Sequence, residues 1–179
     1  MGLWGNTDVD ESRPKWTLDN PTYRANVYAT EAGWVYRHEK YGYEELLVCV
    51  RGLSTDLSWA NIVQFEIIGA PSVAAGSVTV DVVFNETVTV VEGDGITLTV
   101  NDGTQDIVLE VDIANSSANN LRFTKTAGFT LVEARTLTVP KSGQNVVLDN
   151  GASVKDPQAL DVSLNASAMA TAVTATVIA

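Results

Sequence analysis

Few side chains in this sequence could carry out a reaction. His38 is the only histidine and would have to act as the general base, with Cys49, the only cysteine, or Ser54 as the nearest nucleophile. Nucleophilic catalysis needs a nucleophile, a base and an orienting group within hydrogen-bond reach of one another. His38 falls in a predicted turn, and no nucleophile elbow surrounds either candidate. We therefore expect no catalytic residues and no enzyme.

Patterns that bind phosphates or metals are missing or weak. Neither GxGxxG nor GxxxxGK[ST] occurs, so no nucleotide cofactor is expected. Glu44 and Glu45 are neighbours on a predicted strand and point to opposite faces, which excludes a carboxylate pair there. Four other carboxylates gather near two predicted turns: Glu92, Asp94, Asp102 and Asp106. Calcium takes such ligands, but the spacing is not that of an EF-hand, and acidic residues favour turns for backbone reasons. We expect no metal site.

The elements that would position these side chains begin with an aromatic-rich stretch, residues 30–53. Residues 32–37 alternate in the manner of a strand, and residues 44–51 follow as a second strand after a polar turn at 39–42. The apolar centre of the second strand, LLVCV, is typical of a strand buried on both faces. Cys49 is therefore predicted to be a buried, inert thiol.

Residues 1–30 are predicted to form an extended arm. Pro14 and Pro21 disfavour a helix and push the residue before each toward extended geometry. The aromatic side chains of this arm are Trp4, Trp16, Tyr23 and Tyr28. An extended segment cannot bury its own rings, so they must pack on the body of this protein or on a partner. The sequence leaves both alternatives open.

Aromatic side chains mark the predicted partner surface. All four Trp and all five Tyr lie between residues 4 and 59, and such side chains are enriched at protein–protein contacts. The candidate contact residues are Trp4, Trp16, Tyr23, Tyr28, Trp34, Tyr36, Tyr41 and Tyr43. The alternative is that a small module needs these large rings to fill its own core.

The rest of the chain is predicted to be mainly β. A third strand is expected at 59–68, and the small residues at 69–76 are interpreted as a boundary between two modules. Beyond it, period-two alternation and Asp-Gly turns predict strands at 78–84, 87–91, 96–100, 107–113, 121–126, 129–139, 145–149, 160–164 and 172–178. So many short strands predict an immunoglobulin-like β-sandwich at 71–179, after a small β module at 31–70. The last strand is expected at a sheet edge, where it could pair with a second copy.

Composition limits the partners. The chain has 179 residues, a formal net charge of −11 and a pI of about 4.3, so phosphate backbones and anionic membranes would repel it. We expect neither nucleic acid nor membrane as a partner. No apolar run reaches the length of a membrane span, and the first residues lack the pattern of a signal peptide. The expected location is the cytoplasm, or a particle assembled there.

Two segments resemble a known family. The opening MGLWGNTDVDESRPKW, and DNPTYRANVYATEAGWVYR followed by EELLVCVRGL, are similar to the N-terminal part of small virion structural proteins of tailed bacteriophages, especially contractile-tailed phages of marine bacteria. The resemblance covers roughly residues 1–53, and the remainder is similar only as a variable β-sandwich. It implies a protein of the virion, with capsid or other virion proteins as partners.

Within that family, a capsid decoration or cement protein is the expected role. The alternatives are a structural component of the tail, neck or baseplate, or a fibre-type module whose sandwich loops bind a host glycan. The near absence of aromatic residues after residue 69 argues against a sugar site, because sugar sites usually stack rings.

Overall fold

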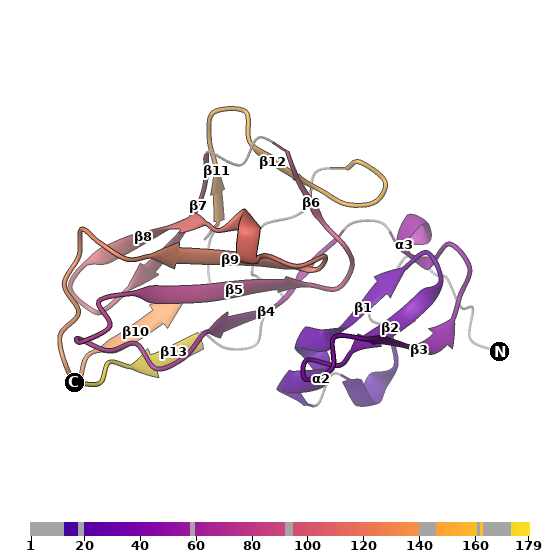
Figure 1. Cartoon of the computed structure of the whole chain (residues 1–179). Helices are drawn as coiled ribbons and strands as arrows, with labels where there is room; N and C mark the ends of the chain where they lie inside the picture. Colours follow the sequence, from indigo (N-terminus) through magenta and orange to yellow (C-terminus); the bar gives the residue numbers. More distant parts are fainter. Residues whose placement is uncertain are drawn as a thin grey trace.

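Strands dominate the structure (Figure 1). The computed structural model describes residues 13–17, 20–57, 60–91, 95–139, 146–160, 162 and 173–179. These residues form a three-stranded, an eight-stranded and a two-stranded sheet. The predicted fold class is confirmed, since the molecule is mainly β and its largest sheet is consistent with a sandwich.

The N-terminal module comprises the described residues up to 57. Its elements are η1 (Lys15–Thr17), α2 (Pro21–Asn26), β1 (Val27–Thr30), β2 (Gly33–Arg37), β3 (Glu44–Cys49) and α3 (Leu53–Asp56). β2 lies between β1 and β3, and both pairings are antiparallel. The predicted hairpin of β2 and β3 is therefore confirmed.

The prediction of an extended arm is wrong for residues 20–30, which form α2 and β1. The side chain of Asn20 caps α2 by accepting a hydrogen bond from the Thr22 amide at 2.9 Å. Pro21 occupies the first turn, where a missing N–H costs nothing because that group has no partner within the helix. The two prolines were therefore a poor guide to the conformation of this segment.

The prediction that β3 is buried on both faces is also wrong. Among the described strands β3 pairs with β2 alone, so it lies at the edge of its sheet. Leu46 is 48% exposed, and Cys49 is exposed as well. An apolar run predicts a strand, but it does not reveal whether other elements cover that strand.

The sheet body comprises the described residues from 60 onward. Its large sheet contains β4 (Ile62–Ile67), β5 (Val78–Phe84), β7 (Ile96–Asn101), β8 (Asp106–Val111), β9 (Asn120–Lys125), β10 (Thr136–Val139), β11 (Val146–Leu148) and β13 (Val173–Thr176). The order is β13-β10-β7-β8-β9-β5-β4, and β11 also pairs with β7. Because β13 contacts β4, the sheet curls until its two ends meet (Figure 1). β6 (Thr89–Val91) pairs with β12 (Ser153–Lys155), and η3 (Ile113–Asn115) follows β8.

Alternation along the strands fills the core of the sheet body. In β7, Ile96, Leu98 and Val100 are buried, whereas the intervening threonines are partly exposed. β8 repeats the pattern with Ile107 and Leu109 inside. These positions are the ones that period-two patterning predicted.

The predicted boundary between modules at 69–76 is wrong. β4, which was assigned to the small module at 31–70, pairs along its length with β5. Residues 69–76 therefore form the loop of a hairpin within the sheet body.

Other strand predictions in the sheet body have mixed outcomes. The described residues 160 and 162 are not in a strand, although a strand was predicted at 160–164, and β12 was not predicted. β13 confirms the predicted final strand. It lies at the end of the strand order, as expected for an edge strand. Beyond β13, the Val73 amide donates to Ile178 O at 2.9 Å.

Candidate partner-binding surface

Six rings form a continuous row on the N-terminal module. In order of contact they are Trp16, Tyr23, Tyr36, His38, Tyr43 and Tyr41. Successive ring centroids are 5.1, 5.2, 4.5, 4.3 and 6.1 Å apart. Four of these separations lie within the usual range of about 4.5–7 Å for interacting aromatic pairs, and the stacked rings of His38 and Tyr43 are slightly closer. We call this set the aromatic row.

Local structure explains how the row is assembled. η1 and α2 supply its first two rings, β2 supplies Tyr36, and the turn after β2 supplies the other three. In that turn the amides of Tyr41 and Gly42 donate to His38 O, and the His38 amide donates to Tyr43 O at 2.9 Å. Gly42 has a φ of 68°, a left-handed conformation that glycine adopts without a steric penalty. The turn thereby folds Tyr43 back onto the His38 ring.

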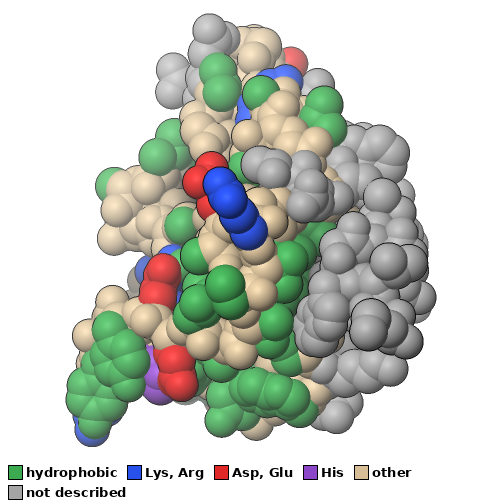
Figure 2. Space-filling model, turned by 90° about the vertical axis from the view of Figure 1, so that its right-hand side faces the viewer, with side chains coloured by type: hydrophobic (Ala, Val, Ile, Leu, Met, Phe, Trp, Pro, Cys, Tyr) green, Lys and Arg blue, Asp and Glu red, His purple; other side chains and the backbone are tan. Residues whose placement is uncertain are grey.

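The two ends of the row are the most exposed part of it. Trp16 is 52% exposed at one end, and Tyr43 and Tyr41 are 52% and 66% exposed at the other. The three rings between them are partly buried, and Tyr23 and Tyr36 pack against the module's hydrophobic core. Figure 2 views the molecule from the side of this module and shows hydrophobic side chains gathered on it, some beside the histidine at a protruding corner. The row is thus anchored in the middle and open at both ends.

Charged groups of both signs border the row. His38 Nε2 lies 3.1 Å from Glu45 Oε2, and Arg37 forms an ion pair with Glu44 at 3.3 Å. The ammonium group of Lys40 lies 5.2 Å from the ring centroid of Tyr41. An apolar strip with a polar rim is the usual anatomy of a protein–protein contact.

The structure divides the eight predicted contact residues. The aromatic row contains Trp16, Tyr23, Tyr36, Tyr41 and Tyr43. Tyr28 and Trp34 are instead buried in the module, so the prediction that they contact a partner is wrong for the folded protein. Trp4 lies outside the described residues. His38 was not predicted as a contact residue, although its position between Tyr36 and Tyr41 in the sequence could have suggested it.

Tyr28 is held inside the module by polar contacts as well as by packing. Its hydroxyl donates to Glu44 and accepts from Arg37, whose guanidinium lies 4.9 Å from the Tyr28 ring centroid. Burial first, and then the hydrogen bond to Glu44, raise the pKa of Tyr28 to about 12. These contacts tie β1, β2 and β3 together across the sheet.

Arg13, which sequence reasoning missed, attaches the start of the described chain to the module. Its side chain is buried and donates to Arg24 O at 2.9 Å, to Val27 O at 3.0 Å and to Thr17 Oγ1 at 3.1 Å. Residues 13–17 therefore pack on their own module. Of the two alternatives left open for the N-terminal segment, these residues follow the intramolecular one, while the ring of Trp16 still faces outward.

The catalytic and metal-binding candidates have other partners. His38 contacts Tyr36, Tyr43 and Glu45, and in the described structure it makes no bond to Cys49 or Ser54. Burial alone would raise the pKa of Asp102, but hydrogen bonds from Gln105 and Thr104 outweigh it and hold the pKa well below its usual range. A carboxylate so fully engaged by donors presents little to a calcium ion. Glu92 and Asp94 lie outside the described residues.

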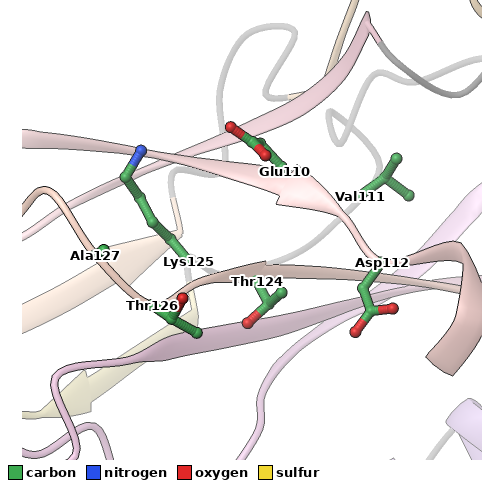
Figure 3. Close-up of a pocket in the computed structure, with 7 residues that line it drawn as sticks. All are labelled: Glu110, Val111, Asp112, Thr124, Lys125, Thr126 and Ala127. Atoms are coloured by element: carbon green, nitrogen blue, oxygen red, sulfur yellow. The ribbon is translucent and has the colours of Figure 1, made fainter.

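A shallow hollow of about 380 Å³ lies at the C-terminal ends of β8 and β9 (Figure 3). Its lining is Glu110, Val111, Asp112, Thr124, Lys125, Thr126 and Ala127. No aromatic ring lines it, and the Asp112 carboxylate already accepts from the Asn115 amide and side chain, which caps η3. The hollow therefore lacks the stacking surface that a sugar site needs.

Comparisons with protein-family models, with curated proteins and with solved structures found no match. Among the described helices, none has the length and apolar character needed to cross a membrane.

Proposed function

We propose that this protein is a non-enzymatic structural component of a phage virion, a capsid decoration protein that binds the assembled shell through its aromatic row. The observation that carries the proposal is the exposure of Trp16, Tyr41 and Tyr43 at the ends of a row whose middle is fixed in the module core. The resemblance of residues 1–53 to virion structural proteins supports it, because that stretch includes all six rings of the row.

The energetics of the row suit attachment to a large surface. Covering a half-exposed Tyr or Trp removes roughly 100 Å² of apolar surface from water, or about 2 kcal/mol. Pre-packed rings lose little side-chain freedom on binding, because their neighbours already restrict them. Three such anchors could dominate a contact of ordinary size, as aromatic hot spots commonly do.

The sheet body has no exposed aromatic ring in its described part, where Phe65 is also buried. Phe84 and Phe123 are completely buried there, and Phe129 is partly buried. The body is therefore free to project from the shell while the N-terminal module makes the contact. An arrangement in which the N-terminal module binds and the sheet body projects is the one expected for a decoration protein.

Substitution of the exposed rings tests the proposal. A triple variant, Trp16→Ala with Tyr41→Ala and Tyr43→Ala, should weaken binding to particles assembled without this protein by at least about 100-fold. The matched control replaces two exposed valines of the sheet body, Val108→Ala and Val147→Ala, and should bind normally. Co-sedimentation with the particles measures both. Normal coating by the triple variant would rule out the row as the attachment surface.

Deletion of residues 2–28 would be a poor test of the aromatic row, because it removes α2 and part of β1 and so breaks the sheet of the module.

Two further observations distinguish the decoration role from the alternative roles. Imaging of intact particles distinguishes the sites directly: density over the shell supports decoration, and density at the neck, tail or baseplate supports those roles. Binding of the isolated protein to a glycan array would support a fibre-type module instead.

A further inference from the structure

The N-terminal module is joined to the sheet body at the residues that follow β5. The Ala29 amide in β1 donates to Asn85 O at 2.8 Å, and Ala29 forms a parallel bridge with Glu86. On the same side of the module, Asn119 Nδ2 donates to Ala25 O at 3.3 Å. The short segment at 85–86 is therefore the place where the sheet body holds β1.

Glu86 is completely buried at this junction. Its relative exposure is 0%, and neither oxygen of its carboxyl group has a hydrogen-bond partner. A buried carboxylate without a partner is strongly disfavoured, so the neutral form should be the one that fits this site. A glutamate is an unusual occupant for such a position, since an apolar residue would fill it without this cost.

A second buried carboxyl group lies nearby. β12 pairs with β6 so that Lys155 faces Thr89, which brings Asp156, the next residue, toward the segment that precedes β6. Asp156 Oδ1 accepts from the amides of Gln158 and Leu160, both at 2.9 Å, while Oδ2 has no partner. Gln158 Nε2 donates to Leu57 O, so this loop also contacts the module.

Other titratable groups around Glu86 are directed elsewhere. Tyr28 of β1 is bound to Arg37 and Glu44. Lys155 is partly exposed and alternates with the buried Val154 of β12, so it points to the other face. The segment beside residue 85 contributes Asn61, which is neutral. Asp156 is therefore the charge that acts on Glu86, and it repels a second negative charge.

Burial, followed by this repulsion, raises the pKa of Glu86 from 4.5 to about 8. The folded junction therefore retains a proton at neutral pH that the unfolded chain would release. The stabilising effect of that proton is complete at acidic pH, and it declines as the pH rises from about 4.5 toward 8.

We propose that Glu86 is a proton-dependent latch between the N-terminal module and the sheet body. With the carboxyl group protonated, β1 is held at Ala29. Loss of the proton to solvent leaves a buried anion next to Asp156, and the junction opens to hydrate it. Where the proposed function holds, this latch sets the orientation of the aromatic row relative to the projecting body. A cation is a less suitable occupant than a proton, because no group of three or more acidic, histidine or cysteine side chains meets within the described structure.

The full-length protein in solution provides the test, independently of any particle. The melting temperature of the wild type should fall by roughly 5 °C or more between pH 6 and pH 9. Hydrogen exchange at the Ala29 amide, corrected for the intrinsic pH dependence, should accelerate over the same range. Glu86→Gln should remove most of both changes. The control Glu110→Gln, at an exposed position of β8, should behave as the wild type does.

A second variant keeps the test decisive if Glu86→Gln folds poorly. Asp156→Asn retains an oxygen for the two backbone amides but removes the charge that repels the Glu86 carboxylate. In this variant, the fall in melting temperature should therefore be centred at a lower pH than in the wild type. Identical pH profiles for the wild type and both variants would overturn the latch. So would a rise in wild-type melting temperature on adding calcium chloride that Glu86→Gln abolishes, since that result would make a cation the occupant.

Discussion

The guanidinium of Arg13 lies against the indole of Trp34, 5.6 Å from the ring centroid, and both side chains are buried. Trp34 is the largest fully buried side chain of the molecule's described part, and the Arg13 side chain covers one of its surfaces. A cation on an aromatic face is stabilising when both are shielded from water. This pair connects the segment before α2 with the middle strand of the module.

Replacement of Arg13 should destabilise the N-terminal module. Arg13→Ala removes the donors to Arg24 O and Val27 O and leaves a cavity over Trp34, which should cost about 2–4 kcal/mol. Arg13→Lys keeps the charge but lacks the planar fork of donors, so it should recover only part of the loss. Chemical denaturation followed by tryptophan fluorescence measures both. Equal stability of wild type and Arg13→Ala would show that the segment contributes no support.

Gly33 should not tolerate a side chain. It has a φ of +132°, and an added Cβ would lie 2.0 Å from Val48 O of β3. Gly33→Ala should therefore separate β2 from β3 and cost more than about 3 kcal/mol. Gly103→Ala is the control, since its Cβ would meet no atom within 4 Å and only the positive φ would be strained. The control should lose about 1 kcal/mol. Thermal unfolding followed by near-ultraviolet circular dichroism distinguishes the two outcomes.

Asp102 should stabilise the sheet body in a pH-dependent way. Its pKa is lowered in the folded state, so its contribution is present above pH 3.8 and is lost as the pH falls below that value. Asp102→Asn should cost about 2–4 kcal/mol at pH 7, because Arg135 and the neighbouring donors lose their charged acceptor. The difference from wild type should shrink in acid. Asp106→Asn, at an exposed position, should change stability little, and a loss equal to that of Asp102→Asn would contradict this explanation.

Shortening a buried side chain in the core of the sheet body should lower the free energy of unfolding more than shortening an exposed one. Leu98 is completely buried in the interior strand β7, and Leu98→Ala should cost about 2–5 kcal/mol. Val108→Ala on β8 removes a side chain that is 41% exposed and should cost less than about 1 kcal/mol. Urea denaturation gives both values. A small effect at Leu98 would mean that the sheet packs less tightly around β7 than its burial indicates.

The sequence predicted strands and their buried residues well where burial follows the alternation of apolar and polar residues within a single strand. Alternation over β7 and β8 identified both strands and their inward residues. The same reasoning failed at β3, where exposure depends on which other elements lie beside the strand. It also failed at α2, where a proline was interpreted as a helix breaker although it occupies the helix start.

The sequence predicted that the candidate surface would be aromatic, but it did not predict which aromatic side chains would lie on it. Tyr36 and Trp34 lie two residues apart in one strand and have similar chemistry, yet one joins the aromatic row and the other is buried beside Arg13. Their neighbours differ, because the Arg13 side chain covers Trp34 whereas Tyr36 packs against Tyr23 of α2. The burial of Glu86 was equally hidden, because it arises from a contact with Ala29 that is remote in sequence.

The meeting of β4 and β13 has a consequence for how the protein is made. These are the first and last strands of the sheet body, so the curled sheet cannot close until nearly all of that unit has left the ribosome. Until then, the inner faces of β5, β7 and β9 remain without their final cover. Pairings between such distant segments form slowly, and exposed apolar strands are prone to association in the interval. Protection of the nascent chain from association should therefore raise the yield of this protein.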